Sequence, residues 1–218
     1  MRAGAGDDGN RVADTTTAHA PAAGTDVLRR LRTATAAEHR TVEETLDLLD
    51  PRLTRDRLVQ VLTAMHGFWR AAEAGLDAWA RAHPGDAARL DWSRRRRSHL
   101  FAADLTSLGS TSDPGPTPDL PPVADTDEAL GRLYVLEGSS LGGVFIDRHL
   151  AGLPQFAGAG RLAAFSPYGE DTGSKWRAFR QATRDRVAAG GDVDRLVGAA
   201  QGTFRALAVW CGARAGRP

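Results

Sequence analysis

The chain has 218 residues, of which 42% are hydrophobic and 25% charged, and its formal net charge is +1. These values suit one domain with a sizeable core, and they give no sign of nucleic acid or a membrane as a partner. The single cysteine, Cys211, excludes an intramolecular disulfide framework and a multi-cysteine metal site, and it is compatible with a cytoplasmic location.

The order of the predicted elements follows from hydrophobic spacing. Residues 1–24 lack the apolar core of a secretory signal, and we expect them to form a disordered tail. Beyond them, apolar residues recur at spacings of three and four, which predicts an all-α fold. We expect helices over residues 26–49, 54–82, 86–108, 126–150, 172–189 and 192–212. The proline-rich stretch 109–122 is predicted to be a loop within a single helical domain spanning residues 25–214.

A histidine interrupts the apolar stripe of the first predicted helix. His39 occupies a position where a leucine would be expected, and Glu43 follows one helical turn later. The carboxylate of Glu43 is placed to accept the proton of one imidazole nitrogen, which leaves the other nitrogen free to bind a metal. The alternative interpretations are a core histidine bonded to the backbone and a solvated glutamate.

The predicted helix 126–150 contains Gly138, Gly142 and Gly143. Each glycine costs a helix about 0.5–1 kcal/mol relative to alanine, so a compensating role is expected. Gly131, Gly138 and Gly142 fall on one helical stripe, where bare backbone permits the close approach of a flat, bulky object. The alternative is close packing against a neighbouring helix.

The two motifs together resemble those of a known family. Leu31 to His39, reading LRTATAAEH, with Glu43 after it, resembles the proximal helix of haem oxygenases. Tyr134 to Gly143, reading YVLEGSSLGG, resembles their glycine-bearing distal helix. The match is most similar to the bacterial, biliverdin-producing type that is often associated with bacterial phytochromes.

The resemblance implies a single-domain helical bundle with haem between the proximal helix and a glycine-kinked distal helix. His39 would bind the haem iron, and the distal helix would contribute Gly138, Ser139, Gly142 and Gly143 as catalytic residues. Animal-type members carry an Asp where this chain has Ser139, which places the proton route in question. The expected cations for the haem propionates are Arg32, Lys175, Arg177 and Arg180. Haem would be substrate and cofactor, consumed with O2 and electrons from a ferredoxin or reductase.

Three other functions remain open at this stage. A haem-binding carrier or sensor accessory protein would keep His39 and the glycines but lack turnover. A helical di-metal or thiaminase-like enzyme would need inward-facing glutamates and Glu-x-x-His pairs, which the predicted helices lack. A purely structural partner leaves His39 and the glycines unexplained. The run Arg94 to Arg97 turns through nearly a full helical circle and is interpreted as solvated, with docking of an electron donor as the alternative. Glu137 is interpreted as a solvated or packing charge, with a contribution to the proton route as the alternative.

Overall fold

The computed structural model describes residues 26–110, 115–157 and 160–215, and the predicted tail 1–24 lies outside them. Within these ranges the chain is helical and has no strand. The helices are α1 (Val27–Ala34), α2 (Ala36–Leu46), α3 (Arg55–Ala82), α4 (Pro84–Arg89), α5 (Ser98–Ser107), α6 (Thr126–Gly152), α7 (Thr172–Ala188) and α8 (Val193–Ala215), with 3-10 turns η1 (Trp92–Arg94), η2 (Pro154–Phe156) and η3 (Gly169–Asp171). The all-α prediction is confirmed, and none of the described helices is long and apolar enough to cross a membrane.

Two predicted helices are divided in the structure. The first predicted helix becomes α1 and α2 because Thr35 has φ −105° and ψ 5°, and its hydroxyl donates to the Leu31 carbonyl at 2.8 Å. It also ends at Leu46 and not at 49, since Asp47 adopts the left-handed conformation at φ 47°. The third predicted helix is divided by Asp91, another left-handed residue at φ 52°. Its first part is the short helix α4, which begins at Pro84, where the sequence predicted a break between two helices.

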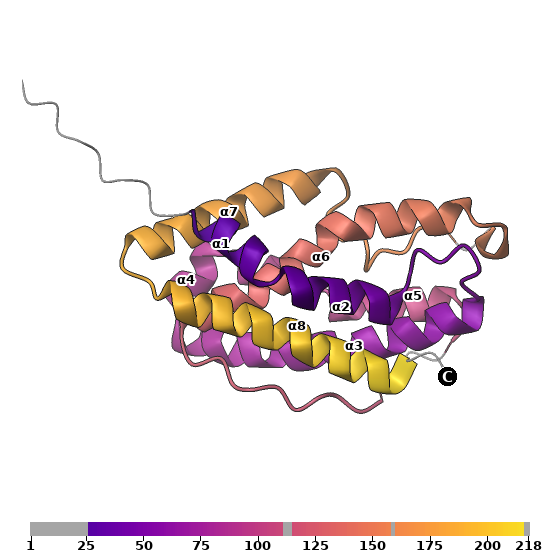
Figure 1. The fold of residues 1–218 in the computed structure, drawn as a ribbon, viewed down its shortest axis with the longest axis horizontal. Coiled ribbons are helices and arrows are strands. Elements are labelled where there is room, and N and C mark those ends of the chain that lie inside the picture. The colour runs from indigo at the N-terminus through magenta and orange to yellow at the C-terminus, as the bar shows by residue number, and fades with distance from the viewer. Residues whose placement is uncertain (1–25, 111–114, 158–159, 216–218) are drawn as a thin grey trace, which may run out of the picture.

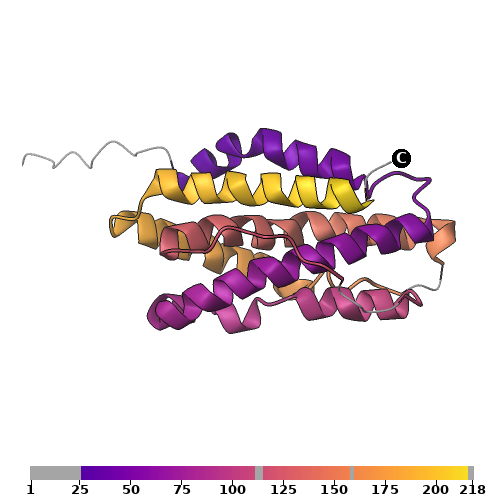
Figure 2. The same ribbon diagram turned by 90° about the horizontal axis from the view of Figure 1, so that it is seen from below.

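Helix α8 packs against α6, α2, α3 and α1 (Figure 1). The core is one contiguous cluster of apolar side chains drawn from all eight helices or their adjoining turns. The view in Figure 2 shows α1 and α2 on the outer side of α8, with α6 and α7 on its other side and α3 to α5 beyond them. Helices α2, α6 and α8 run in the same direction, so successive turns of α2 and α6 progress together along the molecule (Figure 1).

The carboxylate of Asp127, at the start of α6, is surrounded by hydrogen-bond donors. Asp127 accepts hydrogen bonds from Arg186 Nε at 2.7 Å, from Arg186 Nη2 at 3.0 Å and from the Asp192 amide at 3.0 Å. The hydrogen bond with Arg186 lowers the pKa of Asp127 below its usual value of 3.8, against the opposing effect of burial. This carboxylate therefore joins α6 to α7 and to the turn before α8.

We predict that Asp127→Asn lowers the free energy of unfolding by about 1–3 kcal/mol at pH 7, because a charged hydrogen-bond acceptor is lost. A carboxylate with a lowered folded-state pKa stabilises the protein above its unfolded pKa, and that stabilisation is lost as the pH falls through the folded value. The difference between wild type and variant should therefore shrink below pH 3.8. Urea denaturation at several pH values measures it.

Asp194→Asn is the control, because Asp194 pairs with Arg30 while its own side chain is 81% exposed. An exposed pair contributes at most about 1 kcal/mol. A difference between wild type and Asp127→Asn that stays constant down to pH 2.5 would show that the Asp127 charge does not stabilise the fold.

A candidate haem site between α2 and α6

The candidate ligand His39 lies on the exposed side of α2. Its side chain is 56% exposed, its Nδ1 lies 3.3 Å from Glu43 Oε2, and its ring contacts Phe204 of α8 edge-on at 5.6 Å between centroids. The apolar stripe was expected to bury it, but α2 packs mainly on α8, and two stripe members, His39 and Leu49, remain uncovered. The Glu43 carboxylate thus lies beside Nδ1 of the imidazole. The other ring nitrogen, Nε2, has no hydrogen-bond partner among the residues that the structure describes.

The glycines of α6 divide into packed and open positions. A Cβ on Gly131 would overlap the Leu196 carbonyl of α8 and lie 2.7 Å from Ala199 Cβ, so this glycine permits helix packing. A Cβ on Gly138 or Gly142 would meet nothing within 4 Å. One stripe is therefore covered by α8 at its start and open from Gly138 onward.

Gly143 differs from its neighbour. A Cβ there would overlap the Phe165 carbonyl oxygen and lie 2.8 Å from the Phe165 carbonyl carbon. Its missing side chain makes room for the segment after α6, so the structure places Gly143 on the packed side of the helix, away from the open surface that Gly138 and Gly142 share. Its grouping with those two glycines is corrected on this ground.

A contact between helices brings the open glycines near His39. The Tyr134 hydroxyl lies close enough to the Thr35 side chain for Thr35 to lower the pKa of Tyr134, although burial raises that pKa overall. Since α2 and α6 run in the same direction, one further turn along each helix leads from Thr35 to His39 and from Tyr134 to Gly138. The candidate iron ligand and the bare glycine backbone therefore lie on neighbouring turns of adjacent helices.

Ser139 is bound to a buried arginine. Its hydroxyl donates to the Leu136 carbonyl at 2.7 Å and accepts from Arg97 Nη2 at 2.9 Å. Arg97 is 2% exposed, also donates to the Leu136 carbonyl and lies over the Trp69 ring at 5.5 Å. Glu73 of α3 accepts the Arg97 backbone amide at 2.6 Å. A serine thus occupies the position of the animal-type aspartate, with a fixed cation beside it.

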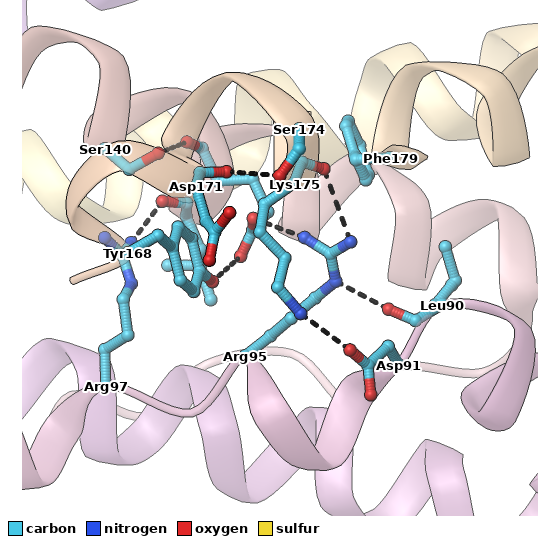
Figure 3. Close-up of polar contacts among 12 residues, drawn as sticks. Leu90, Asp91, Arg95, Arg97, Ser140, Tyr168, Asp171, Ser174, Lys175 and Phe179 are labelled. Carbon is cyan, nitrogen blue, oxygen red and sulfur yellow. Dashed lines mark hydrogen bonds and ion pairs between the residues drawn. The ribbon is translucent and has the colours of Figure 1, made fainter. Parts of the chain in front are cut away.

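A second buried cation, Arg95, binds the same turn of α6 (Figure 3). Arg95 Nη1 donates to Glu137 Oε2 at 2.5 Å, and the Tyr168 hydroxyl donates to Glu137 Oε1 at 2.8 Å. Burial, and then the Glu137 charge, raise the pKa of Tyr168 above its usual value of 10.0. The expectation of a solvated arginine run is wrong for Arg95 and Arg97, whereas Arg94 and Arg96 are exposed. Glu137 has a packing role, which is one of the interpretations made from the sequence, and it forms a buried ion pair with Arg95.

The four predicted propionate cations lie in different places. Arg32 on α1 is exposed and lowers the pKa of the nearby Tyr134, although burial raises that pKa overall. Arg180 of α7 is close enough to Asp26 at the start of α1 to lower its pKa, and Arg177 lies on the same side of α7. Lys175 turns the other way, where Nζ binds Asp91 Oδ2 at 2.7 Å (Figure 3), and it is therefore removed from the expected set.

Apolar side chains border the open glycines. On α6, Phe145 is 65% exposed and Leu141 36%. Phe145 and Gly138 lie seven residues apart, on the same side of the helix. Bare backbone bordered by exposed apolar groups is suited to a large flat apolar ligand. Among the described residues, no three His, Cys, Asp or Glu side chains lie together as a metal site.

Comparison with known proteins identifies the family. No family model matches the chain. A haem oxygenase of Xanthomonas campestris is 30% identical over 146 residues, which cover 66% of this chain and 82% of the relative. The chain belongs to the haem oxygenase family. The haem oxygenase PigA of Pseudomonas aeruginosa is 29% identical over 153 residues, 69% of this chain and 74% of that protein.

A solved structure agrees on the fold. The crystal structure of the NO- and CO-bound haem oxygenase from Neisseria meningitidis superposes with a TM-score of 0.68 at 23% identity, over 89% of this chain and 94% of that one. The predicted haem oxygenase-like helical bundle is confirmed by this agreement. Arg97, Glu73 and the Arg95–Glu137 pair are the residues that the sequence interpretation missed, because each joins segments at least 24 residues apart.

Adjacent glycines are predicted to respond oppositely to substitution. Gly142→Ala should leave the haem-free protein equally stable or stabilise it by up to about 1 kcal/mol, because the new Cβ enters open space. Gly143→Ala should destabilise it by about 1–3 kcal/mol, because the Phe165 backbone must move. Thermal melting followed by circular dichroism measures both, and equal effects at the two positions would contradict this geometry.

Proposed function

We propose that this chain is a haem oxygenase that opens haem to biliverdin, CO and iron, using O2 and electrons from an external donor. The observation that carries the proposal is the neighbouring placement of exposed His39 on α2 and the open glycines Gly138 and Gly142 on α6, in a chain of this family. These residues fit haem, because one side offers a free imidazole nitrogen and the other offers backbone without side chains.

The proximal side is assigned to His39 and Glu43. In the proposal, His39 holds the iron through Nε2, and Glu43 accepts the Nδ1 proton across the observed 3.3 Å. That acceptor fixes the ring orientation and makes the imidazole more basic. Arg32, Arg177 and Arg180 are assigned to the propionates, since an arginine fork matches a carboxylate.

The distal side is assigned to Gly138, Gly142 and Ser139. When bound, haem supplies the iron at which O2 is activated, and the protein's part is to leave room for O2 and deliver protons. Gly138 and Gly142 leave that room. The Ser139 hydroxyl donates its hydrogen bond to the Leu136 carbonyl, which leaves a lone pair to accept a hydrogen bond from water. Arg97 keeps that hydroxyl oriented, in place of the carboxylate found in the animal type.

The proposal includes an electron donor such as a ferredoxin or a reductase, and a cytoplasmic setting in which the buried thiol of Cys211 stays reduced. A bacterial phytochrome is proposed as the recipient of biliverdin, on the resemblance alone.

The test of function is a single-turnover assay. Purified protein is loaded with hemin, reduced with ascorbate or a ferredoxin system in air with catalase present, and followed by absorption spectroscopy. We expect the haem band to give way to verdohaem and then biliverdin. A haem band that persists with every reductant would make the protein a carrier.

We predict that His39→Ala abolishes turnover and changes the haem spectrum while the protein stays folded, because the side chain is 56% exposed and meets the core residue Phe204 only edge-on. Added imidazole should partly restore the spectrum. His99→Ala is the control, since His99 is an exposed histidine on α5. If His39→Ala keeps the wild-type spectrum and rate, the iron ligand is another residue.

A further inference from the structure

The imidazole of His39 has an exposed neighbour and a buried one. Its Nδ1 lies 3.3 Å from Glu43 Oε2, and its ring meets the ring of Phe204 edge-on, with 5.6 Å between the centroids and 75° between the planes. The Glu43 side chain is 66% exposed, whereas Phe204 of α8 is 6% exposed and belongs to the apolar core. The carboxylate can change rotamer in solvent, while the phenyl ring is held by close packing.

Contacts on either side of Phe204 hold α8 in register with the end of α1 and the start of α2. Gln201 Nε2 donates to the Ala34 carbonyl at 2.7 Å, and Arg205 Nε lies 3.5 Å from Glu38 Oε1. Residues 201, 204 and 205 share one side of α8, because they are spaced three and four apart. Helices α2 and α8 lie side by side in both views (Figures 1 and 2). The phenyl ring is therefore kept beside the candidate iron ligand.

The plane of a histidine ring depends on what the ring touches. Rotation about its Cβ–Cγ bond is broad and roughly two-fold, so the torsion has no strong preference of its own. The hydrogen bond with Glu43 selects the nitrogen that faces the carboxylate, but the ring can swing together with that exposed side chain. Edge contact with the buried Phe204 ring limits the plane itself, because the imidazole would lose the contact or collide as it turned.

The plane of an axial imidazole affects the iron that it binds. The filled π orbital of the imidazole stands perpendicular to the ring, so it overlaps one direction of the iron d orbitals more than the other. The plane thus sets the direction in which the ligand passes electron density to the haem. Contacts that orient an axial ligand are one of the means by which a protein tunes its iron.

We propose that Phe204 is a positioning residue that fixes the plane of the His39 imidazole, while Glu43 selects the nitrogen presented to the iron. The inference rests on the proposed function, in which His39 is the iron ligand. Phe204 is assigned no contact with haem and acts through His39.

The contact is tested first in haem-free protein, by NMR spectroscopy of the imidazole protons. The His39 signals are assigned by their loss in His39→Ala. The Phe204 ring current should shift them away from the signals of the exposed histidine His99, and Phe204→Leu should bring the two histidines together. Phe204→Met, whose flexible side chain fills irregular gaps in a core, serves if Phe204→Leu does not fold. Unmoved His39 signals in either folded variant would overturn the proposal without reference to haem.

The consequence is tested in hemin-loaded protein with cyanide bound to the ferric iron. The paramagnetic iron spreads the haem methyl signals in the proton spectrum, and the pattern depends on the plane of the axial imidazole. We expect Phe204→Leu to take up one hemin per chain, as the wild type does, but to change this pattern. Phe156→Leu is the matched control, because Phe156 in η2 is 5% exposed and belongs to the same core but lies outside the contact between α2 and α8.

A wild-type methyl pattern in Phe204→Leu, or the same change in Phe156→Leu, would overturn the positioning role. A wild-type pattern in His39→Ala is a different failure. It would show that His39 does not bind the iron, which removes the proximal assignment of the proposed function and the positioning role with it, even where the haem-free signals have shown the contact.

Discussion

Two buried guanidinium groups determine where the middle of α6 lies. Arg95 and Arg97 reach it from the segment between η1 and α5, and they bind Glu137, the Leu136 carbonyl and Ser139. These contacts reach α6 through Glu137 and Ser139, whose side chains leave the helix on either side of Gly138. The surface at Gly138 and Gly142 therefore needs no packing partner of its own to hold the helix in place. A charge pair buried this deeply is costly to form, but once formed it strongly resists loss of either partner.

Glycine has three different structural roles along α6 and α8. Gly131 lets two helices approach, Gly143 admits the backbone of a following segment, and Gly138 and Gly142 border open space. Helical periodicity places Gly131, Gly138 and Gly142 on one stripe but does not tell where the covering helix ends. On α8, Gly198 and Gly202 are likewise four residues apart with open space at their Cβ positions, and they line a pocket together with Arg132.

Most of the fold follows from apolar spacing, since the stripes of α3, α6 and α8 are long and regular. The breaks at Thr35 and Asp91 do not, because each depends on one residue's backbone conformation within an otherwise helical pattern. Of the site, His39, Glu43 and the open glycines were accessible to sequence reasoning because they lie within single helices. Arg95 and Arg97 resemble a solvated run until Glu73 and Glu137 are brought to them, and the direction of Lys175 depends on Asp91.

The two halves of α6 are secured in different ways. The first half packs against α8 through Gly131 and is tied to α7 through Asp127, whereas the second half rests on a non-helical segment. There Asp147 accepts the Leu162 amide at 3.0 Å, and Asp104 of α5 accepts the amides of Ala163 and Ala164 at 2.9 and 2.8 Å. Most of residues 141–152 are exposed or half-buried, and regions with fewer buried contacts open locally at a lower free energy than well-packed ones do. The first half of α6 is therefore more rigid than the second, and amide hydrogen exchange should become faster along the helix from Gly138 toward Gly152.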